Sequence, residues 1–432
     1  MTDHAEPAVG RMAGKAHAGM NAGIEHLLRT EAPQVLGALV RRFGRFDVAE
    51  DAVQEALLAA SRTWPADGVP DNPRSWLIRI GYRRMVDLLR ADQARRRREQ
   101  DAGVAELAMR EPGRRPGPAR ETDDSLALLL LCCHPALSAT SQVALTLRAV
   151  GGLTTAEIAH AHGTPENTMG TRISRAKQQL ARAGARFTPP ADTDRDSRMA
   201  AAMRVLYLIF NEGYTASTGD RLARVDLTGE AIRLTRALHA SVPADAEITG
   251  LLALMLLTEA RRPARTGGHD ELVTLDEQDR SRWDRDLIRE GTELIDGVWS
   301  RREVGPYQLQ AAIAAVHAAA TSPQQTDWPQ IAALYLWLER LTPTPPVRLS
   351  RVVAVAKAYG PPRGLALLDD LNRRFRLDRD PLIRQRERAV RAHLLQMTGN
   401  VGDAARLYRE AASLTGNQIE RRYLLGRADR LG

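Results

Sequence analysis

The sequence predicts an all-α protein built from several helical parts. Its 432 residues are enough for two or three domains, and 44% of them are apolar, so each domain can bury a core. Only 4% are aromatic, which means that the core must consist mostly of Leu, Ala, Val and Ile. Abundant Ala and Leu, interrupted by short polar breaks, favour helices over strands.

Composition divides the chain into five stretches. Residues 1–20 are small, polar and aperiodic, and we predict either that they are disordered or that translation starts at Met20 instead. Residues 21–95 predict a first helical domain, and residues 96–121, which are charged and rich in Pro and Gly, predict a flexible linker. Residues 122–187 predict a second, compact helical block, and residues 198–432 predict a long third one.

The first helical domain should hold helices on both sides of one loop. Apolar residues in Ile24–Val40 recur at the spacing of one helical face, with Pro33 near the start of a second helix. Another helix is predicted from Val48 to about Thr63. Pro and Gly residues in Trp64–Arg74 predict a loop, and a further helix begins where that loop ends.

The second block carries a helix-turn-helix pattern. Thr154 or Thr155 is placed to cap a helix, with Glu157 as a capping-box partner, and Gly163 should close that helix. Pro165 then stands in the first turn of a new helix. We therefore expect two short helices joined by a sharp turn.

The spacing within this pattern predicts DNA binding. Ala159 is small where two helices must cross closely, and Met169, ten residues on, anchors the second helix. The second helix exposes side chains that can read base edges or hold phosphates. The alternative is that they form a solvated basic face on an ordinary helix. They are Asn167, Thr168, Thr171, Arg172, Arg175, Lys177 and Gln178.

The charge favours a polyanionic partner without requiring one. The formal net charge is +8, and nearly all basic residues are Arg, whose guanidinium forks onto phosphate. Cys132 and Cys133 have neither disulfide nor metal-ligand spacing, and we predict that both are buried in the protein core. Free cysteines of this kind are consistent with a reducing cytoplasm. No stretch reads as a signal peptide or a membrane span, so the sequence predicts an intracellular protein.

The third block predicts a stack of paired helices, such as a tetratricopeptide-like repeat. Its clearest unit is Glu387–Leu414, with a turn at Gly399. His317 is expected in the core, and the charged segment Asp276–Arg285 is expected to be an ion-paired cap or junction. Because no phosphate loop, metal triad or nucleophile elbow accompanies these residues, we predict no catalysis, cofactor or metal.

The segment Leu145–Leu180 resembles the C-terminal DNA-binding domain of extracytoplasmic-function sigma factors. Its TRISRAKQQL run is similar to the recognition helix of that family, with Thr171 at a position where members usually have Ser. The resemblance implies that Arg172, Arg175 and Lys177 touch the −35 promoter element. It also implies core RNA polymerase, through its β′ clamp helices and β flap, as the partner.

The segment Asp47–Ala60 resembles the helix with which these factors bind the β′ clamp helices. Carried over by position, Asp51, Gln54 and Glu55 would make that contact. Leu57 or Leu58 stands where the family often has an aromatic residue. Taken alone, Asp51 and Glu55 would be interpreted as plain solvated charges, and the polymerase contact depends on the two motifs occurring together.

The segment Ser75–Arg90 resembles the family's −10 helix, which opens promoter DNA and holds the melted strand. Arg83 replaces the family's Asn, which leaves direct base readout there in doubt. Aromatic rings and guanidinium groups suit the task, because unpaired bases stack on them. The residues implied for the −10 element are Arg79, Tyr82, Arg83 and Arg84, with Asp67, Asp71 and Asn72 in the preceding loop.

The third block resembles the extension of a subgroup of these factors. We expect a sigma factor with a sigma-2 domain, a sigma-4 domain and a helical-repeat domain that regulates them. Two alternatives are a helical-repeat scaffold with a vestigial DNA-binding half, and a ligand-responsive helix-turn-helix regulator that needs no polymerase.

Overall fold

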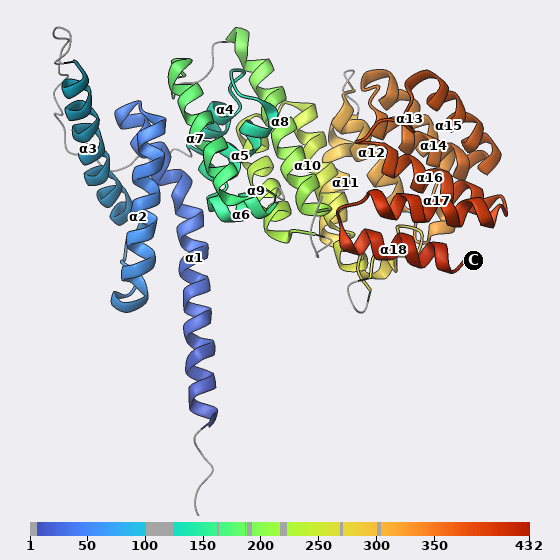
Figure 1. Ribbon diagram of the computed structural model, residues 1–432, viewed down its shortest axis with the longest axis horizontal. Helices are drawn as coiled ribbons and strands as arrows, with labels where there is room; N and C mark the ends of the chain where they lie inside the picture. Colours follow the sequence, from blue (N-terminus) through green and yellow to red (C-terminus); the bar gives the residue numbers. More distant parts are fainter. Residues whose placement is uncertain are drawn as a thin grey trace, which may run out of the picture. The chain divides into compact units, whose positions relative to one another are not determined.

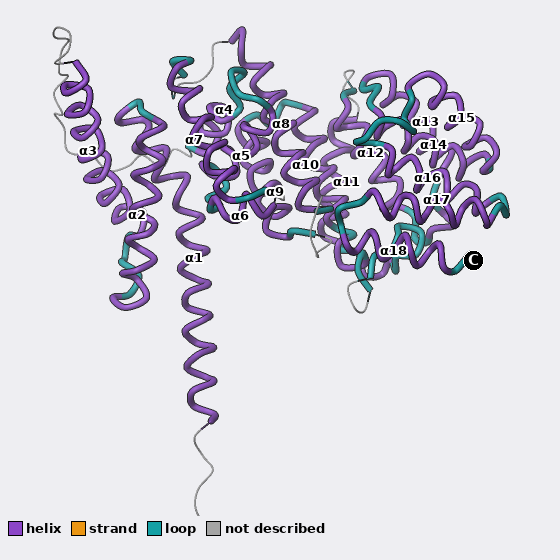
Figure 2. The backbone as a smooth tube through the Cα atoms, viewed as in Figure 1, coloured by secondary structure: helices purple, strands orange, loops and turns teal. Residues whose placement is uncertain are grey.

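The computed structural model is helical throughout the residues it describes (Figures 1 and 2). Those residues contain no strand, only an isolated bridge between Thr266 and Leu272, which confirms the all-α prediction. The chain forms two compact units, divided within one helix at Val205 and Leu206, and Ala161 is grouped with the second unit. The described residues are 7–100, 124–161, 164–185, 187, 192–216, 223–267, 271–299 and 304–432.

Three long helices open the first unit: α1 (Pro7–Phe43), α2 (Phe46–Asp67) and α3 (Pro73–Gln100). Each packs against the other two. Their core contains Leu36 and Leu39 from α1, Trp64 from α2, and Leu77 and Met85 from α3, all fully buried. Burial of large apolar side chains on one stripe of each helix holds the three together.

Two boundaries in this part differ from the sequence-based prediction. α1 is one helix that runs through Pro33, because buried Ala32, Val35 and Leu36 continue a single apolar face across the proline. α2 likewise continues through Pro65, since buried Trp64 anchors its last turn. The loop therefore shrinks to residues 68–72.

The start of α1 also differs from the prediction of disorder over residues 1–20. The helix begins at Pro7, in the first turn, where a proline is tolerated because its missing N–H would have no partner within the helix. Residues 1–6 lie outside the described part of the chain, as do residues 101–121 of the predicted linker. Residues 96–100 of that linker are the end of α3.

Four shorter helices follow in the first unit: α4 (Ser125–Cys132), α5 (Ala139–Ala149), α6 (Thr155–Ala161) and α7 (Glu166–Arg182). Cys132 and Cys133 are both buried, as predicted. Burial raises the pKa of the Cys133 thiol to about 12, so both side chains serve as small apolar groups rather than thiolates.

α8 (Asp192–Tyr214) contains the division between the units, and a continuous series of helices makes up the second unit. Each packs on its neighbours in sequence, as in a helical stack. The series is α9 (Val225–Ser241), α10 (Ala246–Glu259), α11 (Arg285–Trp299), α12 (Pro306–Ala319), α13 (Trp328–Leu341), α14 (Pro345–Tyr359), α15 (Pro361–Phe375), α16 (Arg384–Met397), α17 (Val401–Leu414) and α18 (Gln418–Asp429).

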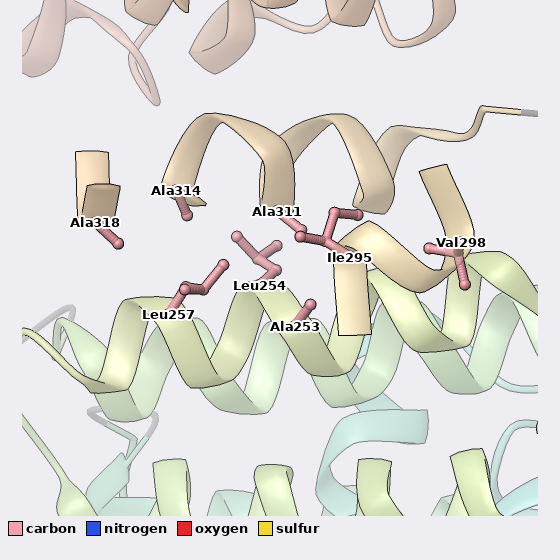
Figure 3. Packing of buried hydrophobic residues seen from close by; sticks show 8 residues of the cluster. All are labelled: Ala253, Leu254, Leu257, Ile295, Val298, Ala311, Ala314 and Ala318. Carbon is pink, nitrogen blue, oxygen red and sulfur yellow. The ribbon is translucent and has the colours of Figure 1, made fainter. Parts of the chain in front are cut away.

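The core of the second unit depends on small residues. Figure 3 shows side chains of α10, α11 and α12 meeting in one apolar cluster, which includes Leu254, Ile295 and Ala311. α10 and α12 approach so closely at Gly250 that a Cβ there would lie 2.7 Å from the backbone nitrogen of Gln308. Alanine and glycine at the crossing thus allow a separation that larger residues would prevent.

The segment between α10 and α11 ties together helices that are not neighbours in sequence. We call residues 276–284 the strap. Asp276 pairs with Lys357 of α14 at 2.5 Å, and Glu277 pairs with Arg427 of α18 at 3.4 Å. Asp284 caps α11 by accepting backbone hydrogen bonds, so the predicted cap or junction is confirmed.

Buried Arg280 is the central residue of the strap. Its guanidinium donates to the backbone oxygens of His317 and Ala320, at 2.9 and 2.7 Å, and to the Thr326 hydroxyl at 2.9 Å. These acceptors lie at the C-terminal end of α12 and just beyond it, where helical carbonyls lack partners within the helix. His317 itself is buried, as expected, with its ring edge-on to Trp328.

Candidate nucleic-acid and polymerase interface

The helix-turn-helix forms as its capping residues predict. The backbone nitrogen of Thr154 donates to the Glu157 carboxylate at 2.7 Å, and the nitrogen of Glu157 donates to the Thr154 hydroxyl at 3.1 Å. This reciprocal pair starts α6 at Thr155. Ala159 and Met169 are buried at the helix crossing, whereas Gly163 lies outside the described residues.

One face of α7 presents the side chains predicted for the −35 element. Asn167, Thr168, Thr171 and Arg175 are exposed, and Arg172 is half-buried. Buried Met169, Ile173, Ala176 and Leu180 hold the opposite face on α5 and its neighbours. The Thr171 hydroxyl donates to the Asn167 backbone oxygen at 2.9 Å, a local bond that a base edge would have to replace.

Lys177 is separated from this face. Its ammonium lies 2.9 Å from a Glu50 oxygen and 2.6 Å from an Asp51 oxygen, both on α2. Ser174 and Gln178 line the same cleft beside α2, which has a volume of about 410 Å³. The seven candidate residues of α7 therefore divide into five that face outward and two, Lys177 and Gln178, that lie beside α2.

The predicted polymerase contacts lie along α2. Asp51 is exposed, while Gln54 and Glu55 are half-buried. Asp51 pairs with Lys177, and Glu55 pairs with Arg84 of α3. Both carboxylates thus hold intramolecular partners rather than being plain solvated charges.

α3 carries most of the side chains predicted for the −10 element. Arg79, Arg83 and Arg84 are exposed, and Tyr82 is half-buried with its ring 5.3 Å from that of Phe43. The side-chain oxygen of Asn72 accepts from the Ser75 nitrogen at 2.9 Å and so caps α3. Because the side-chain oxygen of Asn72 accepts this bond, its side-chain nitrogen is the atom that can donate to another group.

Asp67 and Asp71 do not share one loop. Asp67 is the last residue of α2, whereas Asp71 lies in the short connection to α3, and both are exposed. The packing of Trp76 on Trp64, with ring centroids 5.5 Å apart, fixes the direction in which this connection leaves α2. Trp76 is accordingly a packing residue here.

Sequence reasoning missed the two residues that complete the charge cluster at α2. Glu50 is only 3% exposed and accepts from Arg148 of α5 at 2.8 Å as well as from Lys177. Its spacing from Phe46 and Val53 puts it on the apolar face of α2, which was the available signal. A buried carboxylate at such a position requires cationic partners.

Charge and burial act in opposite directions on this cluster. Burial raises the pKa of Glu50, but Lys177 and Arg148 outweigh it and hold that pKa below its ordinary value. Burial lowers the pKa of Lys177, but Glu50 and Asp51 outweigh it and hold that pKa above its ordinary value. The charged forms of Glu50 and Lys177 therefore stabilise each other.

Other kinds of site are not apparent in the described part of the chain. No group of three or more His, Cys, Asp or Glu side chains there could hold a metal ion. Among the same residues, no helix combines the length and apolar composition needed to cross a bilayer.

The matches to known families follow this division of the structure. Residues 27–96 match Sigma-70 region 2, and residues 127–180 match Sigma-70 region 4. Residues 198–298 match a family of unknown function, DUF6596. The first two matches cover α2 with α3 and α5 with α7, where the polar faces described above lie.

Curated relatives agree with these matches. An uncharacterized protein of Rhizobium meliloti is 40% identical over 414 residues, which cover 94% of this chain and 96% of that protein. The probable ECF RNA polymerase sigma factor SigI of Mycobacterium tuberculosis is 30% identical over 145 residues, 32% of this chain and 48% of that protein. The RNA polymerase sigma factor CnrH of Cupriavidus metallidurans is 33% identical over 153 residues, 34% of this chain and 78% of that protein.

No solved structure matches the chain significantly. The region 2 and region 4 matches lie in the same order as the two groups of helices in the first unit, and the named relatives are sigma factors. The chain therefore belongs to the sigma-70 family of RNA polymerase sigma factors, as an extracytoplasmic-function member with a long helical C-terminal extension.

Proposed function

We propose that this sigma factor binds core RNA polymerase through α2, opens the −10 element with α3 and reads the −35 element with α7. The observation that carries the proposal is the division of exposed and half-buried polar side chains into separate sets, one on each of these helices. Acidic and amide groups gather on α2, and guanidinium groups gather on α3 and α7. Each set has the charge that its proposed partner requires.

The outward face of α7 suits a major groove. Its 17 residues give a rod about 25 Å long, and such a rod fits a groove about 12 Å wide. Arg175 and half-buried Arg172 can fork onto guanine or phosphate, and the hydroxyls of Thr168 and Thr171 can reach either. These residues are our candidates for −35 recognition.

The exposed face of α3 suits a melted strand. Arg79 and Arg83 supply positive charge for phosphates, and the Tyr82 ring, held by Phe43, offers a surface for one unpaired base. Arg84 is paired with Glu55, so it must release that carboxylate to contact DNA. Asp67 and the Asn72 amide are candidates for polar contacts to a base beside them.

For polymerase, Asp51, Gln54 and Glu55 are the candidate contacts, with the β′ clamp helices and β flap as the candidate surfaces. Sigma factors are not enzymes, and we propose no catalytic activity for the extension. We propose instead that the second unit regulates the first. The protein should act in the cytoplasm, where core polymerase is.

Run-off transcription with core polymerase on a pool of upstream DNA fragments tests the proposal. New transcripts should require the protein and should fall about a hundredfold with Arg172→Ala/Arg175→Ala, because two contacts of about 1–3 kcal/mol each are lost. Asp51→Ala/Glu55→Ala should abolish binding to core without DNA. Arg289→Ala, at an exposed position of α11, is the matched control and should change neither result.

A chain that ends at Tyr214, the last residue of α8, tests the role of the extension. Transcripts from this chain alone would make the second unit an inhibitor, and loss of transcripts would make it an activator. If both chains fail to give transcripts, the sigma function is wrong for these domains and the scaffold becomes the better hypothesis. DNA binding that needs no polymerase would instead favour a ligand-responsive regulator.

A further inference from the structure

In the first unit, a charge cluster joins the recognition helix to the polymerase-binding helix. Glu50 of α2 accepts from Lys177 of α7 at 2.9 Å and from Arg148 of α5 at 2.8 Å, while Asp51 accepts from Lys177 at 2.6 Å. Two candidate contact residues with different proposed partners, Asp51 for polymerase and Lys177 for DNA, thus bind each other.

The burial of this cluster gives the contact its strength. The side chains of Glu50, Lys177 and Arg148 are only 4%, 11% and 13% exposed. A buried pair is poorly screened by salt, and removal of one partner leaves the other as an uncompensated charge. The cluster is therefore a specific attachment rather than a chance pairing of surface side chains.

The cluster is part of a wider interface between the same two groups of helices. Arg29 of α1 donates to Glu157 of α6 at 2.7 Å, and Gln34 of α1 donates to Ser125 of α4 at 3.3 Å. Gly152, whose φ is +66°, lies so close to α1 that a Cβ would stand 2.8 Å from the Arg29 backbone oxygen. Several elements on each side are thus fitted to one another.

This arrangement cannot persist on a promoter. The −10 and −35 elements are about 25 base pairs apart, which is about 85 Å along the helix axis. Helices joined by ion pairs shorter than 3 Å cannot reach both elements at once. The groups must therefore separate. The 25 Cα–Cα steps from Gln100 to Ser125 can span at most about 90 Å, which is enough for that distance.

We propose that Lys177 is an interdomain latch, which with Arg148 holds the −35 domain against α2 and keeps the sigma factor in a closed state of low affinity for core polymerase. The closed state competes with polymerase for Asp51 and for the face of α2 around Glu50. Core binding must break the latch, and this frees Lys177 for DNA. The inference rests on the proposed polymerase-binding role of α2.

Distance labels test the latch without polymerase. Donor and acceptor dyes at Leu58→Cys on α2 and Gln179→Cys on α7 occupy exposed positions, whereas the native cysteines are buried. In the full-length chain, energy transfer should be high, should fall with Lys177→Met and should persist with Lys177→Arg. Unchanged transfer in Lys177→Met would overturn the latch.

Core affinity, measured without DNA, tests the inhibitory role. Lys177→Met should bind core roughly three to thirty times more tightly than the wild type, because less of the binding energy is used to open the protein. Arg175→Ala, which removes a charge from the outward face of the same helix, should leave core affinity unchanged and weaken only promoter binding. A role of Lys177 in DNA contact alone predicts no change in core affinity.

The two measurements separate the possible failures. Reduced energy transfer with unchanged core affinity would overturn the inhibitory role, because the interface would then not compete with polymerase. A wild-type protein that does not bind core would contradict the proposed function, while the dye measurement would still decide the latch. Circular dichroism of Lys177→Met confirms that the fold survives.

Discussion

Replacement of Arg280 should destabilise the second unit far more than replacement of its neighbour Arg282. Arg280 is 5% exposed and donates three hydrogen bonds to groups at and beyond the end of α12, whereas Arg282 is exposed, in the same short 3-10 turn (Arg280–Arg282). Both arginines are replaced by Met, because Met keeps an apolar side chain of similar length and removes the guanidinium.

The contacts of Arg280 set the size of the effect. Hydrogen bonds from a charged donor contribute about 1.5–3 kcal/mol each, and the cost of burying the guanidinium offsets part of that gain. Loss of the donor leaves the carbonyls of His317 and Ala320 and the Thr326 hydroxyl to find other partners. We expect Arg280→Met to lower the free energy of unfolding by about 3–5 kcal/mol.

Urea unfolding of the full-length chain, followed by circular dichroism and by tryptophan fluorescence, measures this difference. In a thermal unfolding experiment, Tm should fall by about 6–20 °C in Arg280→Met, at about 2–4 °C per kcal/mol for a unit of this size. Arg282→Met should stay within about 0.5 kcal/mol of the wild type. Equal effects of the two substitutions would refute the reasoning, because the network would then contribute nothing beyond a surface charge.

Three further predictions concern packing and protonation. Gly250→Ala should lower the free energy of unfolding by about 1–3 kcal/mol in thermal unfolding, because the added methyl group forces α10 away from α12. Gly297→Ala, which has open space around it, should raise that free energy by up to about 1 kcal/mol. The reverse order would show that α10 and α12 can move apart at little cost. Burial and nearby arginines lower the pKa of His317 to about 3, so only the unfolded state binds this proton as pH falls below 6.5. The free energy of unfolding should therefore fall by about 1.4 kcal/mol per pH unit below that pH. His317→Gln should remove this contribution in urea titrations at pH 7 and pH 5, and an unaltered slope would contradict the prediction. Cys132 and Cys133 should react with a thiol reagent only after unfolding in guanidinium, and rapid labelling of the native protein would disprove their burial.

Local patterns in the sequence predicted much of the fold and part of the candidate site. The capping box of Thr154 and Glu157 depends on residues three apart, and the turn at Gly399 depends on one residue with φ of +83°, so both are readable from a short stretch. The ends of α2 were less readable. Pro65 suggested a loop, but the burial of Trp64 kept the chain helical.

Contacts between distant residues were beyond local reasoning. Glu50 meets Arg148 and Lys177, which are 98 and 127 residues away, and no pattern within one helix identifies such a partner. The place of Glu50 on an apolar face indicated only that some cation was needed. Likewise, the composition of the strap predicted ion pairs, while its partners on α14 and α18 come from folding of the whole unit.

The strap has a consequence for the order in which the second unit folds during synthesis. Glu277 meets Arg427 across 150 residues, and Ala216 accepts from Asn417 across 201. A nascent chain can stack α9 to α17 one after another, but these closing contacts wait until α18 has left the ribosome. Until then, the strap and the buried face of α17 lack their last cover, so chaperones or degradation would compete with completion of this unit during that interval.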